Sequence, residues 1–357
     1  MTSSHKKRSF PIRATVIALV AVCVAFVAFR SPGSNRLKQA REDVARGTSQ
    51  SAIKNYLGYL DGSPEDHGAR LELAELMKPL DSDIALEHLQ KIPRSATEYS
   101  EAIWHIAHIA IVGKQDVLAE DALRKLDKVR PQNAGVALSL AELYYRTERY
   151  SQALPWVQQA ARLQPERPLT WLLMAEVLDH LKRPGEMLQP LRKALELNSD
   201  LYPAHANLAY ALQFSGNAQE AEIEARWCLA RQPDDIRVRR WLSMILRDHG
   251  KHDEALNQIR LAIAGSPTDV DCRIVEAELL LFRREAEVAY NALMPLYRVH
   301  SNRRDYLSSL ARAAALSGRR EESRRYQQEI VKIIEEQAAK VNPTPPVREA
   351  PPIGVRP

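Results

Sequence analysis

Small residues recur in this chain at a fixed interval of thirty-four positions, and this interval restricts what the chain can fold into. Alanine fills six of the eight positions of one register and six of the seven positions of a second. Proline fills four of the six positions of a third. Registers that stay in phase in this way are typical of stacked repeats of one supersecondary unit. The three registers are Ala85, Ala119, Ala153, Met187, Ala221, Ala255, Ala289 and Ser323; Ala107, Ala141, Ala175, Ala209, Ser243, Ala277 and Ala311; and Pro131, Pro165, Ser199, Pro233, Pro267 and Ser301.

The repeat at residues 134–167 predicts two helices. Apolar side chains of its first half lie three, one and three positions apart, which places them on one helix face: Ala137, Leu140, Ala141 and Tyr144. A polar break follows, and then a second apolar face that ends before the proline of the third register. Two such helices of about twelve to fourteen residues bury these faces only when each pair stacks on the next. The sequence therefore predicts an all-α, elongated scaffold, which favours binding over catalysis.

Further positions follow the same interval in neighbouring repeats: Trp171, Met174, Ala175, Leu178, Leu191 and Ala194, then Leu208, Ala209, Leu212, Ala221, Ala225, Cys228 and Pro233. This pattern resembles that of tetratricopeptide repeat (TPR) proteins. The resemblance implies a right-handed superhelical solenoid of about nine helix–turn–helix units over residues 33–337. Helical-pair repeats with a shorter or longer period are the alternative.

The first thirty residues differ from the repeats. Residues 1–13 form a basic flank, and an uncharged run from Ala14 to Phe29 follows, closed by Arg30. As a helix this run spans about 24 Å, somewhat less than a bilayer core of about 30 Å. The flanking apolar residues and a snorkelling arginine extend its reach. We therefore expect one transmembrane signal anchor at 14–30, with a cleaved signal peptide as the alternative.

The orientation of this anchor rests on a smaller difference. Both flanks carry four basic residues near the apolar run, so the count of lysine and arginine does not decide it. The very short N-terminus favours a cytoplasmic N-terminus. We expect a single-pass protein of a bacterial inner membrane, with the repeats in the periplasm.

The C-terminal segment, residues 338–357, is rich in proline. A segment this rich in proline forms neither a helix nor a packed core, so we expect a disordered tail. The motif from Pro343 to Arg348 fits a PxxPxR ligand of aromatic-lined grooves, although a solvated spacer is the simpler interpretation. The prolines are Pro343, Pro345, Pro346, Pro351, Pro352 and Pro357.

Motifs for chemistry are absent from the sequence. It has no glycine-rich phosphate loop, no HExxH pair and no nucleophile elbow, so we expect no enzyme, no catalytic residue, no cofactor and no small-molecule substrate. His105 and His108 lie three apart and could in principle share a metal, but no third ligand is in view, and we expect none to be bound. Cys228 and Cys272 have neither metal nor redox spacing, and a disulfide between them is left open.

The resemblance also implies a groove, lined by set positions of the first helix of each unit. These positions predict an acidic stretch, an aromatic step and a basic stretch, which suit a peptide with apolar anchors and charge. A merely solvated face is the alternative. The residues are Glu142, Tyr145, Glu176, Asp179, Tyr210, Gln213, Phe214, Arg237, Arg240, Met244 and Arg247.

These features predict a non-catalytic, membrane-anchored adaptor that binds partner proteins or peptides in this groove, in the assembly of bacterial envelope complexes. One alternative is a regulatory or biogenesis factor for a secreted polysaccharide, lipopolysaccharide or cytochrome c pathway. A nucleic-acid-associated basic solenoid is another, prompted by a formal net charge of +5 and by clustered C-terminal arginines. Glutamates interleave with these arginines, so we expect no nucleic acid to bind.

Overall fold

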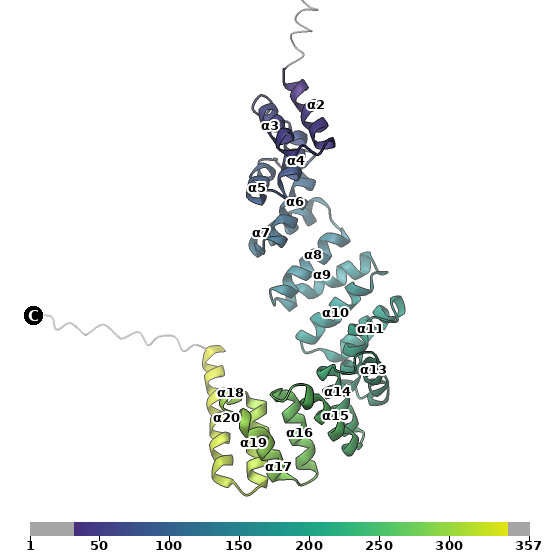
Figure 1. The fold of residues 1–357 in the computed structure, drawn as a ribbon, viewed down its shortest axis with the longest axis vertical. Helices are drawn as coiled ribbons and strands as arrows, with labels where there is room; N and C mark the ends of the chain where they lie inside the picture. The colour runs from purple at the N-terminus through teal and green to yellow at the C-terminus, as the bar shows by residue number, and fades with distance from the viewer. Residues whose placement is uncertain (1–31, 342–357) are drawn as a thin grey trace, which may run out of the picture. The chain divides into compact units, whose positions relative to one another are not determined.

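The computed structural model describes residues 32–341, and all regular structure in this range is helical (Figure 1). The predicted basic flank 1–13, the predicted anchor 14–30 and residues 342–357 of the predicted tail lie outside the described residues. Within 32–341, no helix combines the length and the apolar character needed to cross a bilayer.

The described helices form nine successive pairs, the number expected from the sequence, and they divide into two compact units between Pro165 and Glu166. We call them the N-terminal unit and the C-terminal unit. Four pairs belong to the N-terminal unit: α2 (Pro32–Ala45) with α3 (Ser49–Leu60), α4 (His67–Met77) with α5 (Ser82–Gln90), α6 (Tyr99–Val112) with α7 (Asp116–Val129), and α8 (Ala134–Arg146) with α9 (Tyr150–Leu163).

Five pairs belong to the C-terminal unit. Its last helix ends at Val341, four residues beyond the solenoid boundary expected from the sequence. The pairs are α10 (Pro168–His180) with α11 (Pro184–Leu197), α12 (Tyr202–Phe214) with α13 (Ala218–Arg231), α14 (Ile236–Asp248) with α15 (His252–Gly265), α16 (Val270–Phe282) with α17 (Ala286–Leu293), and α19 (Arg304–Leu316) with α20 (Arg320–Val341); a 3₁₀ turn η1 (Met294–Leu296) and the short α18 (Tyr297–His300) follow α17.

The two registers of small residues meet inside each helix pair. All their members are buried, and two serines show the contact directly. The hydroxyl of Ser243 donates to the carbonyl of Ala255 (2.8 Å), and that of Ser323 donates to the carbonyl of Ala311 (2.9 Å). First and second helices therefore cross where a small residue of one faces a small residue twelve positions away. A large pair of side chains here would overpack the crossing.

Prolines end the second helices, as predicted. α7 and α13 stop two residues before Pro131 and Pro233, because a proline restricts the preceding residue and supplies no amide donor. The second helix of the eighth pair is interrupted instead: Pro295 lies in η1, and the helix restarts as α18.

A left-handed residue joins the two helices of most pairs, which the sequence analysis did not predict. Each such residue is followed by an amide that donates to the carbonyl five positions earlier, as Arg183 does to Leu178 (3.0 Å). This is the hydrogen bond of a Schellman helix end. Gly47 joins α2 to α3 in this way, and the other seven positions share one register. Three of these seven are glycine, so the other four carry backbone strain. The positions, again thirty-four apart, are Lys114, Glu148, Lys182, Gly216, Gly250, Arg284 and Gly318.

Replacing a strained residue at one of these left-handed positions with glycine is expected to stabilise the protein. Lys182→Gly should raise the free energy of unfolding by about 1 kcal/mol, and Gly216→Ala should lower it by about as much. A methyl group on Gly216 would meet nothing within 4 Å, so its cost is in the backbone alone. Denaturant titration followed by circular dichroism measures both. Lys182→Ala is the control: it removes the side chain but keeps the strain, and a gain there as large as that of Lys182→Gly would contradict this explanation.

A carboxylate on the second helix joins neighbouring pairs in the C-terminal unit. Glu222 on α13 accepts hydrogen bonds from Lys251 (2.9 Å), Arg226 (2.9 Å) and His249 (3.1 Å), two of which precede α15 in the next pair. Burial alone would raise the pKa of Glu222, but these hydrogen bonds lower it to about 2. The charged carboxylate therefore stabilises the contact between the two pairs.

The N-terminal unit repeats this contact at the equivalent position of an earlier repeat. Glu120 on α7 accepts from the hydroxyl of Tyr144 on α8 (2.7 Å) and from Arg149 (2.6 Å). The hydrogen bond from Tyr144 outweighs burial, and with those from Arg149 and Arg124 it lowers the pKa of Glu120 to about 2. The same device thus recurs in both units.

Glu222→Gln is expected to make stability less dependent on pH. Because the folded-state pKa lies below that of the unfolded chain, the contribution is full above about pH 5 and is lost as the pH falls towards 2. At pH 7 the variant should lose about 2 kcal/mol of unfolding free energy, and this difference from the unmodified protein should shrink as the pH falls from 5 towards 2. Urea titrations at several pH values measure this. Glu196→Gln, which removes an exposed ion pair to Lys193, should show little gap at any pH, and a constant gap for Glu222→Gln would contradict the assignment.

Candidate functional site

The first helices of the C-terminal unit form a continuous layer. α10 contacts α12, α12 contacts α14, α14 contacts α16, and α16 contacts α19, whereas the second helices of neighbouring pairs make less contact with one another. The first helices are therefore more closely spaced and line the inner side of this unit. We call this surface the first-helix face.

The predicted groove residues fall in both units. Two lie on α8 of the N-terminal unit, where Glu142 is exposed and the ring of Tyr145 contacts Tyr150 edge-on at 5.7 Å. The rest lie on the first-helix face of the C-terminal unit: Glu176 and Asp179 on α10; Tyr210, Gln213 and Phe214 on α12; and Arg237, Arg240, Met244 and Arg247 on α14.

Three aromatic rings gather on this face, and we call them the aromatic cluster. The ring of Tyr210 lies 4.7 Å from that of Phe214 and 5.3 Å from that of Trp241, measured between centroids. The guanidinium of Arg237 lies 5.0 Å from the ring centre of Trp241. Phe214 is 56% exposed, so its ring is accessible to a partner. The sequence analysis missed Trp241, although its spacing of four from Arg237 on one helix is a readable signal.

The acidic and aromatic residues meet at Tyr210. Burial raises the pKa of Tyr210, and the charge and hydrogen bond of Asp179 raise it further. The Tyr210 hydroxyl on α12 and the Asp179 carboxylate on α10 therefore interact across neighbouring first helices. The aromatic cluster is bordered at this side by a carboxylate.

An unused acceptor lies next to the aromatic cluster. The side-chain amide of Gln213 donates to Asp248, but its buried oxygen has no donor among the described residues. A buried acceptor without a partner is uncommon and destabilising. Gln213 also lines a cavity of about 610 Å³ at the turn before α13, together with Gly216, Asn217 and His249.

The predicted basic stretch is largely neutralised within the protein. Arg240 pairs with Asp271 (2.7 Å), and Arg247 pairs with Glu278 (2.5 Å), both on the following first helix, α16. Arg303, before α19, shares Asp271 (2.7 Å). Within residues 32–341, Arg237 makes no ion pair. The first-helix face thus presents aromatic surface between balanced charges rather than a run of positive charge.

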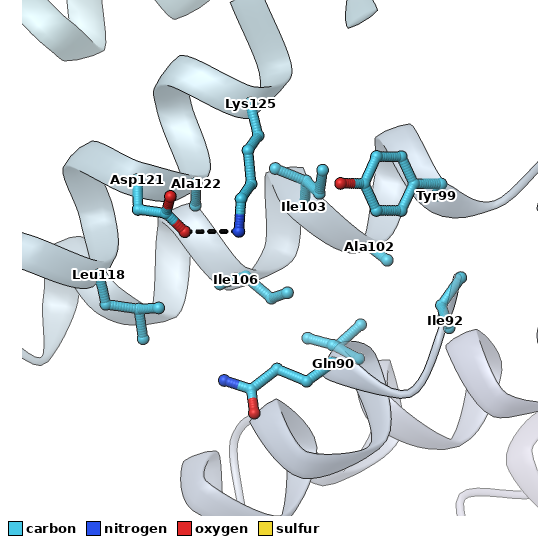
Figure 2. A pocket seen from close by; sticks show the side chains of 11 residues that line it. Gln90, Ile92, Tyr99, Ala102, Ile103, Ile106, Leu118, Asp121, Ala122 and Lys125 are labelled. Atoms are coloured by element: carbon cyan, nitrogen blue, oxygen red, sulfur yellow. Dashed lines mark ion pairs between the residues drawn. The ribbon is translucent and has the colours of Figure 1, made fainter. Parts of the chain in front are cut away.

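A separate pocket of mixed polar and apolar lining lies in the N-terminal unit between α5, α6 and α7 (Figure 2). Its volume is about 300 Å³. It exists because α5 has nine residues where α7 has fourteen, so the end of α5 leaves part of its neighbours uncovered. Ile103 and Ile106 line it, and the ion pair between Asp121 and Lys125 (2.7 Å) borders it. Pro93, soon after α5, is the sequence signal for the short helix.

The two cysteines among the described residues are free, so the disulfide that the sequence left open is not formed. Cys228 lies on α13 and Cys272 on α16, in pairs that are not adjacent. Both are buried, and burial raises the pKa of each thiol to about 12. They fill small core positions and are unreactive.

Models of the tetratricopeptide repeat match residues 118–186 and 206–270, which include members of all three repeat registers. The protein is a TPR protein. Its fold also resembles the crystal structure of PilW, described as a widely conserved type IV pilus biogenesis factor, with a TM-score of 0.50 and 20% identity over 60% of this chain and 100% of that chain.

Two further structures share the fold at lower similarity. MamA is 17% identical over 48% of this TPR protein and 94% of its own chain, with a TM-score of 0.45. YrrB, described as a TPR protein with an unusual peptide-binding site, is 18% identical over 61% of this chain and 95% of its own, with a TM-score of 0.39. No curated protein matches the sequence at a significant level. These likenesses concern the fold alone.

Proposed function

We propose that this TPR protein is a non-catalytic, membrane-anchored scaffold that binds a partner protein or peptide on the first-helix face of its C-terminal unit. The observation that carries the proposal is the aromatic cluster, in which Phe214 is more than half exposed. The cluster lies on the first-helix face, where each first helix contacts the next. Exposed aromatic residues in a packed setting contribute strongly to protein interfaces. Membrane anchoring rests on the apolar sequence of residues 14–30.

The chemistry of the face defines the segment it would bind. The rings of Phe214 and Trp241 offer apolar contact area for a bound peptide. Asp179 and Arg237 flank the rings with opposite charges. A peptide with an apolar anchor and charged neighbours fits this arrangement.

We place this scaffold in the assembly of a bacterial envelope complex, as a single-pass inner-membrane protein whose repeats form a right-handed superhelix in the periplasm. PilW offers an example of a TPR fold in a biogenesis factor, although the likeness to it extends only to the fold. A regulatory or biogenesis role in a polysaccharide, lipopolysaccharide or cytochrome c pathway is the alternative.

Nucleic-acid binding is the weaker alternative, because several of the C-terminal arginines that prompted it make contacts within the protein. Among the C-terminal arginines, Arg303 pairs with Asp271 (2.7 Å) and Arg319 pairs with Glu287 (2.5 Å). Arg325 contacts the rings of Tyr297 and Tyr326. Paired arginines attract phosphate less than free ones, which is why we favour a protein or peptide partner over nucleic acid.

Removing the two rings of α12 should weaken partner binding without unfolding the protein. We expect Tyr210→Ala combined with Phe214→Ala to reduce affinity by about thirtyfold, because hot-spot aromatic residues contribute about 2 kcal/mol. The full-length protein is crosslinked in its native membrane, and the captured partner is quantified by mass spectrometry. The helical melt is recorded in parallel and should be close to that of the unmodified protein.

Phe282→Ala provides the matched control. Phe282 occupies the same repeat position as Phe214, is 64% exposed, and stacks on His252 at 3.9 Å outside the aromatic cluster. Capture should survive this change. Undiminished capture by the double variant, or equal loss in both, would contradict the proposed binding surface.

The proposed orientation gives a second test. In intact spheroplasts an added protease should degrade the repeats, because the periplasmic side is open to it, while a cytoplasmic marker protein stays intact. Immunoblotting with an antibody against the repeats measures this. Full protection of the repeats until the membrane is lysed would reverse the orientation.

A further inference from the structure

Three side chains with metal-ligand chemistry converge on the first helices of the N-terminal unit. Glu75 lies on α4, and Glu101 and His105 lie on α6. One ligand atom from each lies within 4.8 Å of the others, and Nε2 of His105 is 2.9 Å from a carboxylate oxygen of Glu75. Among residues 32–341, no other group of three such side chains comes together in this way.

The local sequence explains why this group forms. Glu101 and His105 are four residues apart on one helix, so their side chains lie on the same face one turn apart. Glu75 comes from the first helix of the preceding pair, which is why no spacing in the sequence reveals it. The sequence analysis considered His105 with His108, but His108 is exposed and is not part of the group.

The ligand set selects a class of metal. Imidazole nitrogen suits Zn²⁺ and neighbouring transition metals, whereas Mg²⁺ and Ca²⁺ prefer oxygen ligands alone. Two carboxylates balance the charge of a divalent ion, and three protein ligands leave a position for water, as in open zinc sites. The side chain of His105 is only 13% exposed, so packing orients its ring. Glu75 and Glu101 are exposed and can adjust to the ion.

We infer that Glu75, Glu101 and His105 form a binding site for a divalent transition metal. Zn²⁺ fits these ligands better than Mg²⁺ or Ca²⁺ does. The ion would join α4 to α6 and so fasten two neighbouring helix pairs of the N-terminal unit. Its binding should therefore raise the melting temperature, because a ligand that binds only the folded state stabilises it.

Zinc binding by the untagged full-length protein tests this site. Isothermal titration with Zn²⁺ should show one site that is absent in titrations with Mg²⁺. Glu101→Gln and His105→Gln should each weaken it by about tenfold or more, because each loses a ligand. His108→Gln, on the same helix, should bind as the unmodified protein does. The zinc-dependent rise in melting temperature should follow the same order.

These variants test the metal site independently of the proposed scaffold function. Glu101 is exposed, so Glu101→Gln should fold normally, and far-ultraviolet circular dichroism verifies this. No zinc binding by the unmodified protein would overturn the inference, and so would binding that Glu101→Gln and His105→Gln leave unchanged. Partner capture by the aromatic cluster depends on other residues, so either proposal can fail without the other.

Discussion

The contact between two small residues inside each helix pair is the constraint on which the rest of the structure depends. Where Ser243 meets Ala255, and Ser323 meets Ala311, the two helix backbones approach closely enough for a hydroxyl to reach a carbonyl. This crossing fixes which faces of the two helices point outward towards the neighbouring pair. Met187 is an exception to the small-residue crossing. Its large side chain is accepted because the residue that faces it on the first helix is still alanine.

Contacts between pairs then decide how the units hold together, because each pair touches only its neighbours. Apolar burial supplies most of the attraction between neighbouring helix pairs, but it does not fix how far one pair is shifted along the helix axes of the next. The carboxylates of Glu120 and Glu222 do so, since each accepts directional hydrogen bonds from the next pair. Their recurrence at one repeat position indicates that the repeat specifies its interface as well as its hairpin.

Much of the fold could be predicted because its determinants are local. Registers of alanine and proline gave the helix pairs and the ends of the second helices, and the buried residues confirm them. The site was less accessible to such reasoning. Pairing of Arg240 with Asp271 depends on the spacing of α14 and α16, which no pattern within one repeat contains. The left-handed positions were missed because lysine, glutamate and arginine occupy several of them and conceal the turn.

The neutralised arginines bear on the kind of partner that the proposed binding surface would select. An acidic peptide approaching Arg240 or Arg247 would have to displace Asp271 or Glu278, and would gain little by exchanging one carboxylate for another. An apolar side chain placed against Phe214 displaces only water. Recognition on this face would therefore come from shape and buried aromatic area, with charge acting mainly on the rate and orientation of encounter.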